Sequence, residues 1–100
     1  MLKKYEEAIE AYKEAIRVYK NYVSAYNNLG LDYKKLGRYE EAIEPLKEAI
    51  KINPKYSNAH YNLGLVYHEL GEKDTAMKEY EILKELNAGL AEQLLKTISE

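Results

Sequence analysis

The 100-residue sequence contains no cysteine, tryptophan or phenylalanine and only two prolines. Without cysteine the chain can form no disulfide and offers no thiol nucleophile or thiolate metal ligand. Its longest apolar run, residues 63–67, is far shorter than the roughly 18 residues that span a bilayer. These absences exclude a disulfide framework and argue against a membrane partner. They lead us to expect a reducing compartment, namely the cytoplasm.

A strong excess of charge of one sign is also missing. Lysine and arginine number 15 and aspartate and glutamate 17, which gives a formal net charge of −2. Without a basic patch we expect no nucleic-acid partner. Hydrophobic residues make up 46% of the sequence and charged residues 32%, which is typical of a globular chain rather than a disordered one.

The sequence repeats itself at a fixed period. NNLGLDYKKLG occupies residues 27–37, and the closely similar YNLGLVYHELG occupies residues 61–71. When residues 23–56 are aligned with residues 57–90, ten of 34 positions are identical. At the same offset, residues 2–22 match residues 36–56 at 12 of 21 positions. A fixed period of this length is typical of a protein built from stacked copies of one small unit.

Each unit contains two helices, judging by the spacing of its apolar residues. The spacing predicts helices over residues 23–36 and 39–52, separated by Gly37, and over residues 57–70 and 73–86, separated by Gly71. Asn53 and Pro54 end the first helix pair, because the residue before a proline is disfavoured in the α region. Each unit is therefore a helical hairpin.

Both first helices carry a glycine in the middle, Gly30 or Gly64. A glycine there costs roughly 1 kcal/mol relative to alanine, so its presence needs a reason. The second helices carry Ala42 and Ala76 on their apolar faces. Because small residues on both sides let two backbones come close, we expect each glycine to face the alanine of its own unit.

The repeated motif resembles the tetratricopeptide repeat, whose pattern is W-x2-L-G-x2-Y followed by A-x3-F and P over a unit of about 34 residues. At these positions the first unit has Tyr26, Leu29, Gly30, Tyr33, Ala42, Leu46 and Pro54. The second unit has His60, Leu63, Gly64, Tyr67, Ala76, Tyr80 and Ala88. The resemblance implies an all-α solenoid of antiparallel helix hairpins, with His60 packed in the core in the tryptophan position.

The resemblance covers nearly the whole chain as a single domain over residues 1–100. Its expected parts are an orphan N-terminal helix in a half repeat over 2–22, full repeats over 23–56 and 57–90, and a capping helix over 88–100. A start in mid-repeat also fits a fragment of a longer array. Pro45, inside a helix, is expected to bend it locally and to leave the carbonyl of Glu41 to water.

In this family the first helices line a concave groove that holds peptides. Transferred to this chain, the resemblance implies a partner-binding stripe of Asn27, Leu31, Lys34, Lys35, Asn58, Tyr61, Asn62, Leu65 and His68. Leu31, Leu65 and Tyr61 would form a small apolar trough there. The alternative is that the two leucines merely touch the neighbouring first helix.

Some members of the family hold the C-terminal carboxylate of a chaperone in a clamp of lysine, asparagine and arginine. Here Asn62, and Lys96 less securely, fall on clamp positions, whereas Asn27 and Leu31 stand where the clamp needs lysine and asparagine. We therefore predict that this chain lacks such a clamp.

A second hypothesis is self-association through the orphan helix. One flank of that helix lacks its usual partner, so we expect an exposed apolar patch made of Ala8, Ile9, Tyr12, Ala15 and Ile16. The patch could pair with a second copy or exchange helices with it, which makes a homo-oligomer possible.

The sequence offers little for catalysis. His60 and His68 are eight residues apart, and no H-E-x-x-H motif accompanies them. The glycines lie within or at the ends of helices and fit no phosphate-binding loop. We expect no catalytic residue, no metal site and no cofactor, and a protein or peptide as the partner.

Overall fold

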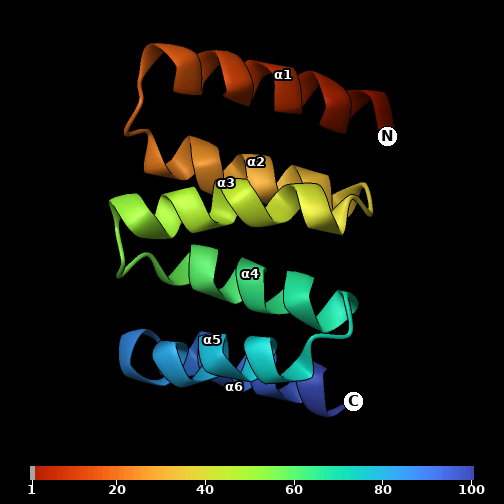
Figure 1. Ribbon diagram of the computed structural model, residues 1–100, viewed down its shortest axis with the longest axis vertical. Helices are drawn as coiled ribbons and strands as arrows, with labels where there is room; N and C mark the ends of the chain where they lie inside the picture. Colours follow the sequence, from red (N-terminus) through yellow and green to blue (C-terminus); the bar gives the residue numbers. More distant parts are fainter. Residues whose placement is uncertain (1) are drawn as a thin grey trace.

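The computed structural model describes residues 2–100, and in this part of the chain helices joined by short turns are the only regular secondary structure. Six helices follow one another along it (Figure 1): α1 (Leu2–Val18), α2 (Val23–Lys35), α3 (Tyr39–Ile52), α4 (Ser57–Glu69), α5 (Lys73–Leu86) and α6 (Ala88–Ser99). The four central helices end within one residue of the expected positions. The orphan helix α1 ends at Val18, within the half repeat expected over residues 2–22.

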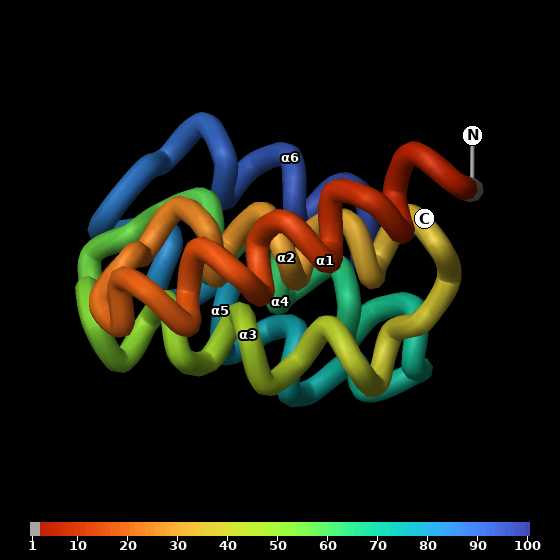
Figure 2. The backbone as a smooth tube through the Cα atoms, turned by 90° about the horizontal axis from the view of Figure 1, so that it is seen from above, coloured from red at the N-terminus to blue at the C-terminus, as the bar shows by residue number. Residues whose placement is uncertain are grey.

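The helices stack in the order of the chain. α2 pairs with α3, and α4 pairs with α5, as two hairpins; α1 packs on α2, and α3 packs on α4. α4 also touches α2 and α6, so the first helices of successive units form one row. Seen from above, α3 and α5 lie on one side of α2 and α4, and α6 lies on the other (Figure 2). The expected all-α solenoid of helix hairpins is confirmed.

Both hairpin turns are closed by a glycine in the left-handed region. Gly37 and Gly71 each have φ of +77°, which L-residues with a side chain rarely adopt. The amide of Arg38 donates to the carbonyl of Tyr33 at 2.9 Å, and the amide of Gly37 donates to the carbonyl of Lys34 at 2.9 Å. This pair of bonds is the Schellman arrangement that ends helices. The same two bonds recur around Gly71.

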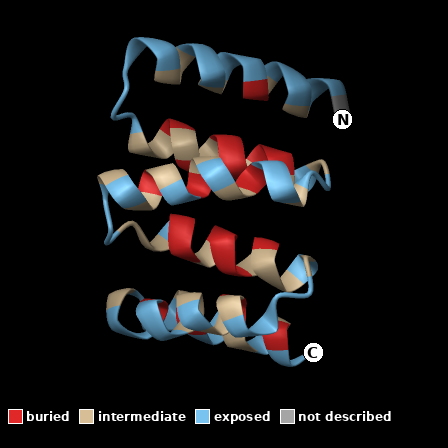
Figure 3. Cartoon of the chain, viewed as in Figure 1, coloured by how far each residue is buried: buried red, intermediate tan, exposed pale blue. Residues whose placement is uncertain are grey.

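Burial is concentrated in α2 and α4, which are enclosed by the other helices (Figure 3). In the first repeat, a Cβ atom added to Gly30 would lie 2.5 Å from Cγ of Leu46 and 3.2 Å from the carbonyl oxygen of Ala42. Leu46 and Ala42 are both fully buried. The expected close approach of Gly30 to Ala42 is therefore confirmed.

In the second repeat the expectation is wrong. A Cβ atom at Gly64 would meet Leu94 of α6 first, at 2.6 Å, and then Cβ of Glu79 at 3.4 Å, rather than Ala76. The position of Leu46 is taken here by Tyr80, which is only half-buried. Leu94, fully buried, fills the space beside Gly64 instead.

α6 reaches this space because its linker to α5 is very short. Asn87 is both the last boundary residue of α5 and the N-cap of α6, and its side-chain oxygen accepts from the amide of Leu90 at 3.1 Å. An asparagine in this position satisfies one of the amides that a helix start leaves unpaired.

Replacing Pro45 with alanine is expected to stabilise the protein by about 2 kcal/mol. α3 runs without interruption from Tyr39 to Ile52 although Pro45 lies inside it and has no amide hydrogen to donate. An interior proline costs roughly 3 kcal/mol, part of which is offset because proline also restricts the unfolded chain. Urea denaturation of the two proteins measures the difference. No gain in stability would show that the helix accommodates Pro45 without cost.

Candidate peptide-binding groove

The row formed by α2, α4 and α6 is the surface on which the groove is expected. Leu31 of α2 is half-buried and is packed into neither of the two hydrophobic cores of the described chain. Lys34, one turn further along α2, is also half-buried. These two side chains lie on the stripe that the sequence assigned to partner binding.

Asn27 and Asn62 form the floor of this surface rather than its exposed wall. The side-chain nitrogen of Asn62 donates to the side-chain oxygen of Asn27 at 3.0 Å. Asn62 is only 7% exposed and Asn27 only 5%. Their amides therefore join α2 to α4 through one nitrogen and one oxygen. That Asn27 and Asn62 also contact a partner stays a prediction. A buried amide left without this partner would cost about 1–3 kcal/mol.

Tyr61 and Leu65 of α4 are shared between the groove and α6. Both are half-buried and pack against the core that contains Ala91 and Leu94 of α6. Leu65 therefore packs against the second core, whereas Leu31 belongs to neither core. Both interpretations of the two leucines stay open.

A charged group of residues lies at the ends of α2 and α4. Burial lowers the pKa of Lys34, and the carboxylate of Glu69 acts in the opposite direction. The hydroxyl of Tyr39 donates to Oε1 of Glu69 at 3.2 Å, and burial together with this bond raises the pKa of Tyr39. Of the other expected groove residues on α4, His68 is half-buried and Asn58 is exposed.

Lys35 does not belong to the groove. Its ammonium lies 5.6 Å from the centre of the Tyr5 ring of α1, a cation–π distance. α1 packs on the side of α2 away from α4 (Figure 1). The expectation for Lys35 is wrong because the side chains of neighbouring helical residues point about 100° apart, so Lys34 and Lys35 diverge.

The apolar residues of the orphan helix do not form the exposed patch that the sequence predicted. Ile9 is only 3% exposed, and Tyr12 and Ile16 pack on the core beneath α2. Ala8 and Ala15 are half-buried. The large exposed apolar residues of the described chain are Val18, Tyr19, Tyr22 and Ile82. Self-association stays a prediction, but the five expected patch residues give it no open surface of large apolar side chains.

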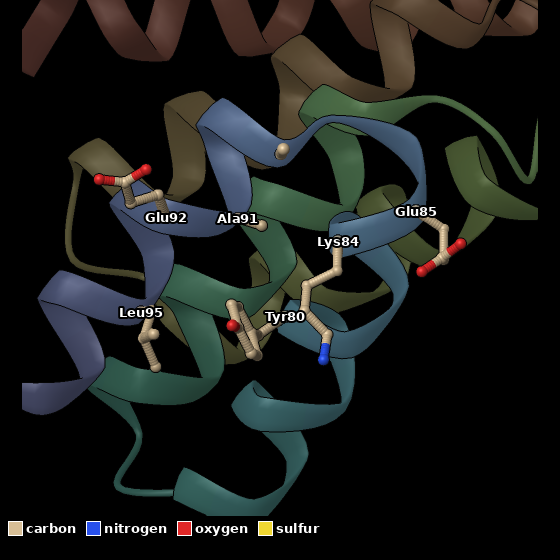
Figure 4. Close-up of a pocket in the computed structure, with 7 residues that line it drawn as sticks. Tyr80, Lys84, Glu85, Ala91, Glu92 and Leu95 are labelled. Atoms are coloured by element: carbon tan, nitrogen blue, oxygen red, sulfur yellow. The ribbon is translucent and has the colours of Figure 1, made fainter.

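A hollow of about 460 Å³ that the sequence did not predict lies between α5 and α6. Tyr80 of α5 and Leu95 and Ala91 of α6 face one another across it, with Lys84 and Glu92 at its edge (Figure 4). The available signal was Tyr80 itself, which stands where the first repeat has Leu46.

Comparisons with known proteins follow the repeat along the chain. A TPR repeat model matches residues 2–37 and 30–71, and a tetratricopeptide repeat model matches residues 57–89. The chain belongs to the tetratricopeptide repeat family. The comparison with curated proteins gives no match. Among the described helices, none is both long and apolar enough to cross a membrane.

Solved structures of tetratricopeptide repeat domains superpose closely on this one. The first TPR of Spaghetti (RPAP3) bound to the HSP90 peptide SRMEEVD is 26% identical, with a TM-score of 0.90 over 96% of this chain and 78% of that one. The second TPR domain of human RPAP3, in complex with the HSP70 peptide SGPTIEEVD, is 30% identical, with a TM-score of 0.90 over 97% and 82%. The Arabidopsis OM64 TPR domain, at 20% identity and a TM-score of 0.90 over 97% and 82%, shares the fold.

Proposed function

We propose that this protein is a non-enzymatic interaction module that binds an extended peptide segment of a partner protein along α2 and α4. The observation that carries the proposal is Leu31, an aliphatic side chain that is half-exposed and packs into neither core. Two similar domains are solved with peptides bound, which supports the same use of this fold.

The residues around Leu31 suit one stretch of peptide. The Asn27–Asn62 pair fixes the spacing of α2 and α4, so the surface is preformed and its ordering costs little on binding. Leu31 and the exposed part of Tyr61 can bury an apolar side chain of the peptide. Lys34 can pair with an acidic one, because its partly buried ammonium is poorly hydrated.

Replacing Leu31 with glutamate is expected to weaken peptide binding at least about tenfold, because it places a charge in the apolar centre of the groove. A peptide library selects the ligand, and titration calorimetry measures its affinity for each variant. Ile82→Glu is the matched control, since Ile82 is an exposed aliphatic residue on α5, outside this row of helices. Equal losses, or no loss at Leu31, would contradict the proposed groove.

Binding of SRMEEVD is expected to be at least about a hundredfold weaker than in a domain with a complete carboxylate clamp. Asn27 carries no positive charge, and the side-chain nitrogen of Asn62 already donates to the side-chain oxygen of Asn27. A charge-assisted bond to a carboxylate is roughly twice as strong as a neutral one, so the missing lysine matters. Fluorescence anisotropy compares SRMEEVD with its C-terminal amide. Tight binding that amidation abolishes would show that a clamp is present.

A further inference from the structure

One buried histidine of α4 has both ring nitrogens engaged. His60 is 4% exposed. Its Nε2 lies 2.7 Å from the carbonyl oxygen of Pro54, in the connection between α3 and α4. Its Nδ1 lies 2.7 Å from Oε1 of Glu79 on α5, and the Glu79 side chain is only 13% exposed. The ring thus links its own helix, α4, to α5 and to the α3–α4 connection.

The chemistry of these two partners fixes the protonation of the ring. A peptide carbonyl oxygen can only accept a hydrogen bond, so Nε2 must carry a hydrogen. When the Glu79 carboxylate is ionised it can also only accept, and Nδ1 then carries a hydrogen as well. An imidazole with hydrogens on both nitrogens is positively charged.

We propose that His60 is a buried imidazolium that joins α4 to α5 and to the α3–α4 connection. Raising the pH removes a proton from the ring and weakens these contacts. When the ring loses the Nδ1 hydrogen, its lone pair faces the carboxylate of Glu79 at the same short distance. Repulsion then replaces attraction at a site that water hardly reaches. The contacts of His60 therefore position α4, the helix that also carries the groove residues Tyr61 and Leu65.

The first repeat supports this assignment by contrast. At the equivalent positions of that repeat, Tyr26 stands in place of His60 and Pro45 in place of Glu79. A tyrosine and a proline form no ion pair, so both members of the pair are present in one repeat and both are absent from the other. The two residues therefore act together rather than as parts of the general repeat pattern.

The surroundings oppose and favour the charge at once. Burial lowers the pKa of His60, but the hydrogen bonds to Glu79 and to the Pro54 carbonyl, with the charge of Glu79, outweigh it and raise the pKa overall. Among the described residues, Glu79 is the charged side chain acting on the ring. α6 contributes Leu94, which is apolar and packs beside Gly64 one turn along α4.

The sign of the pH effect follows from the raised pKa. The unfolded histidine has a pKa of about 6.5, so the stabilisation is complete below that pH. It is lost as the pH rises through the higher pKa of the folded state. The free energy of unfolding should therefore fall as the pH rises above the pKa of the unfolded histidine, in a step that belongs to one group.

NMR titration of the imidazole nitrogens in ¹⁵N-labelled protein tests the proposal directly. We expect His60 to carry hydrogens on both nitrogens at mildly acidic pH and to titrate at a higher pH in the folded protein than in the same chain unfolded in urea. His68→Gln assigns the signals, since the chain has only two histidines. Titration of His60 at the same or a lower pH than in the unfolded chain would overturn the proposal.

Glu79→Gln separates the ion pair from simple packing. Glutamine can donate its side-chain amide to a neutral Nδ1, so the contact survives without charge. With the carboxylate gone, burial prevails, and His60 is expected to titrate below the unfolded chain. The decrease in the free energy of unfolding with rising pH, measured by urea denaturation, should then disappear. An unchanged titration in this variant also refutes the pairing; if the variant does not fold, the titration of the natural protein decides alone.

Discussion

Replacing Gly30 with alanine is expected to destabilise the protein by about 3 kcal/mol, although alanine is the better helix former. The added methyl group would lie 2.5 Å from Cγ of Leu46 and 3.2 Å from the Ala42 carbonyl oxygen. Cγ is the branch point of a fully buried side chain and the carbonyl belongs to the backbone of α3, so neither can yield cheaply. The helices of the first hairpin must then separate.

Two other glycines make this a graded series. Gly64→Ala meets mainly the end of Leu94, at 2.6 Å, so we expect a smaller loss as that side chain and α6 shift. Gly89→Ala in α6 meets only Oδ1 of Asn87, at 3.4 Å, an ordinary contact distance. There the helix preference should prevail and stabilise by about 0.5–1 kcal/mol.

Urea denaturation of the three variants gives the order directly, with the slope m as a check that the same surface unfolds in each. A stabilised Gly30→Ala protein would mean that the first hairpin is not packed at backbone distance. Equal losses at positions 30 and 89 would point to a general effect of the substitution instead.

The sequence was enough to predict what is repeated in this fold. The repeat period indicated the helix pairs, and glycine at residues 37 and 71 indicated the turns, because a left-handed residue is needed there whatever surrounds it. The approach of Gly30 to Ala42 could be predicted because both residues belong to one hairpin. Local chemistry and the hydrophobic pattern point to the same structure at these places.

What escaped prediction depends on contacts between units. Leu94 of α6 lies beside Gly64, and the α5–α6 linker is very short, and neither fact follows from the repeat pattern. The partner-binding stripe on α2 stays a prediction, and the pairing of Asn27 with Asn62 depends on how closely α4 approaches. The contact of Lys35 with Tyr5 likewise depends on how α1 packs against α2.

Replacing Leu94 with alanine is expected to cost about 2–5 kcal/mol, because it removes a fully buried side chain and leaves a cavity between α6 and α4. A domain of this size has a total stability of only about 5–15 kcal/mol. A loss of about 5 kcal/mol would therefore unfold a large fraction of the molecules if the total stability is at the low end of that range. Leu95→Ala, the adjacent half-buried leucine on the same helix, is the control, with an expected loss of about 1 kcal/mol.

The double variant Gly64→Ala, Leu94→Ala shows whether the two residues share one space. Alanine at position 94 leaves room beside α4, and the methyl group added at position 64 partly fills it, so the combined loss should be smaller than the sum of the two single losses. The difference is the coupling energy, and residues in contact typically give about 0.5–3 kcal/mol. Strict additivity would mean that α6 does not insert Leu94 against Gly64, and that it caps the solenoid without entering the second hairpin.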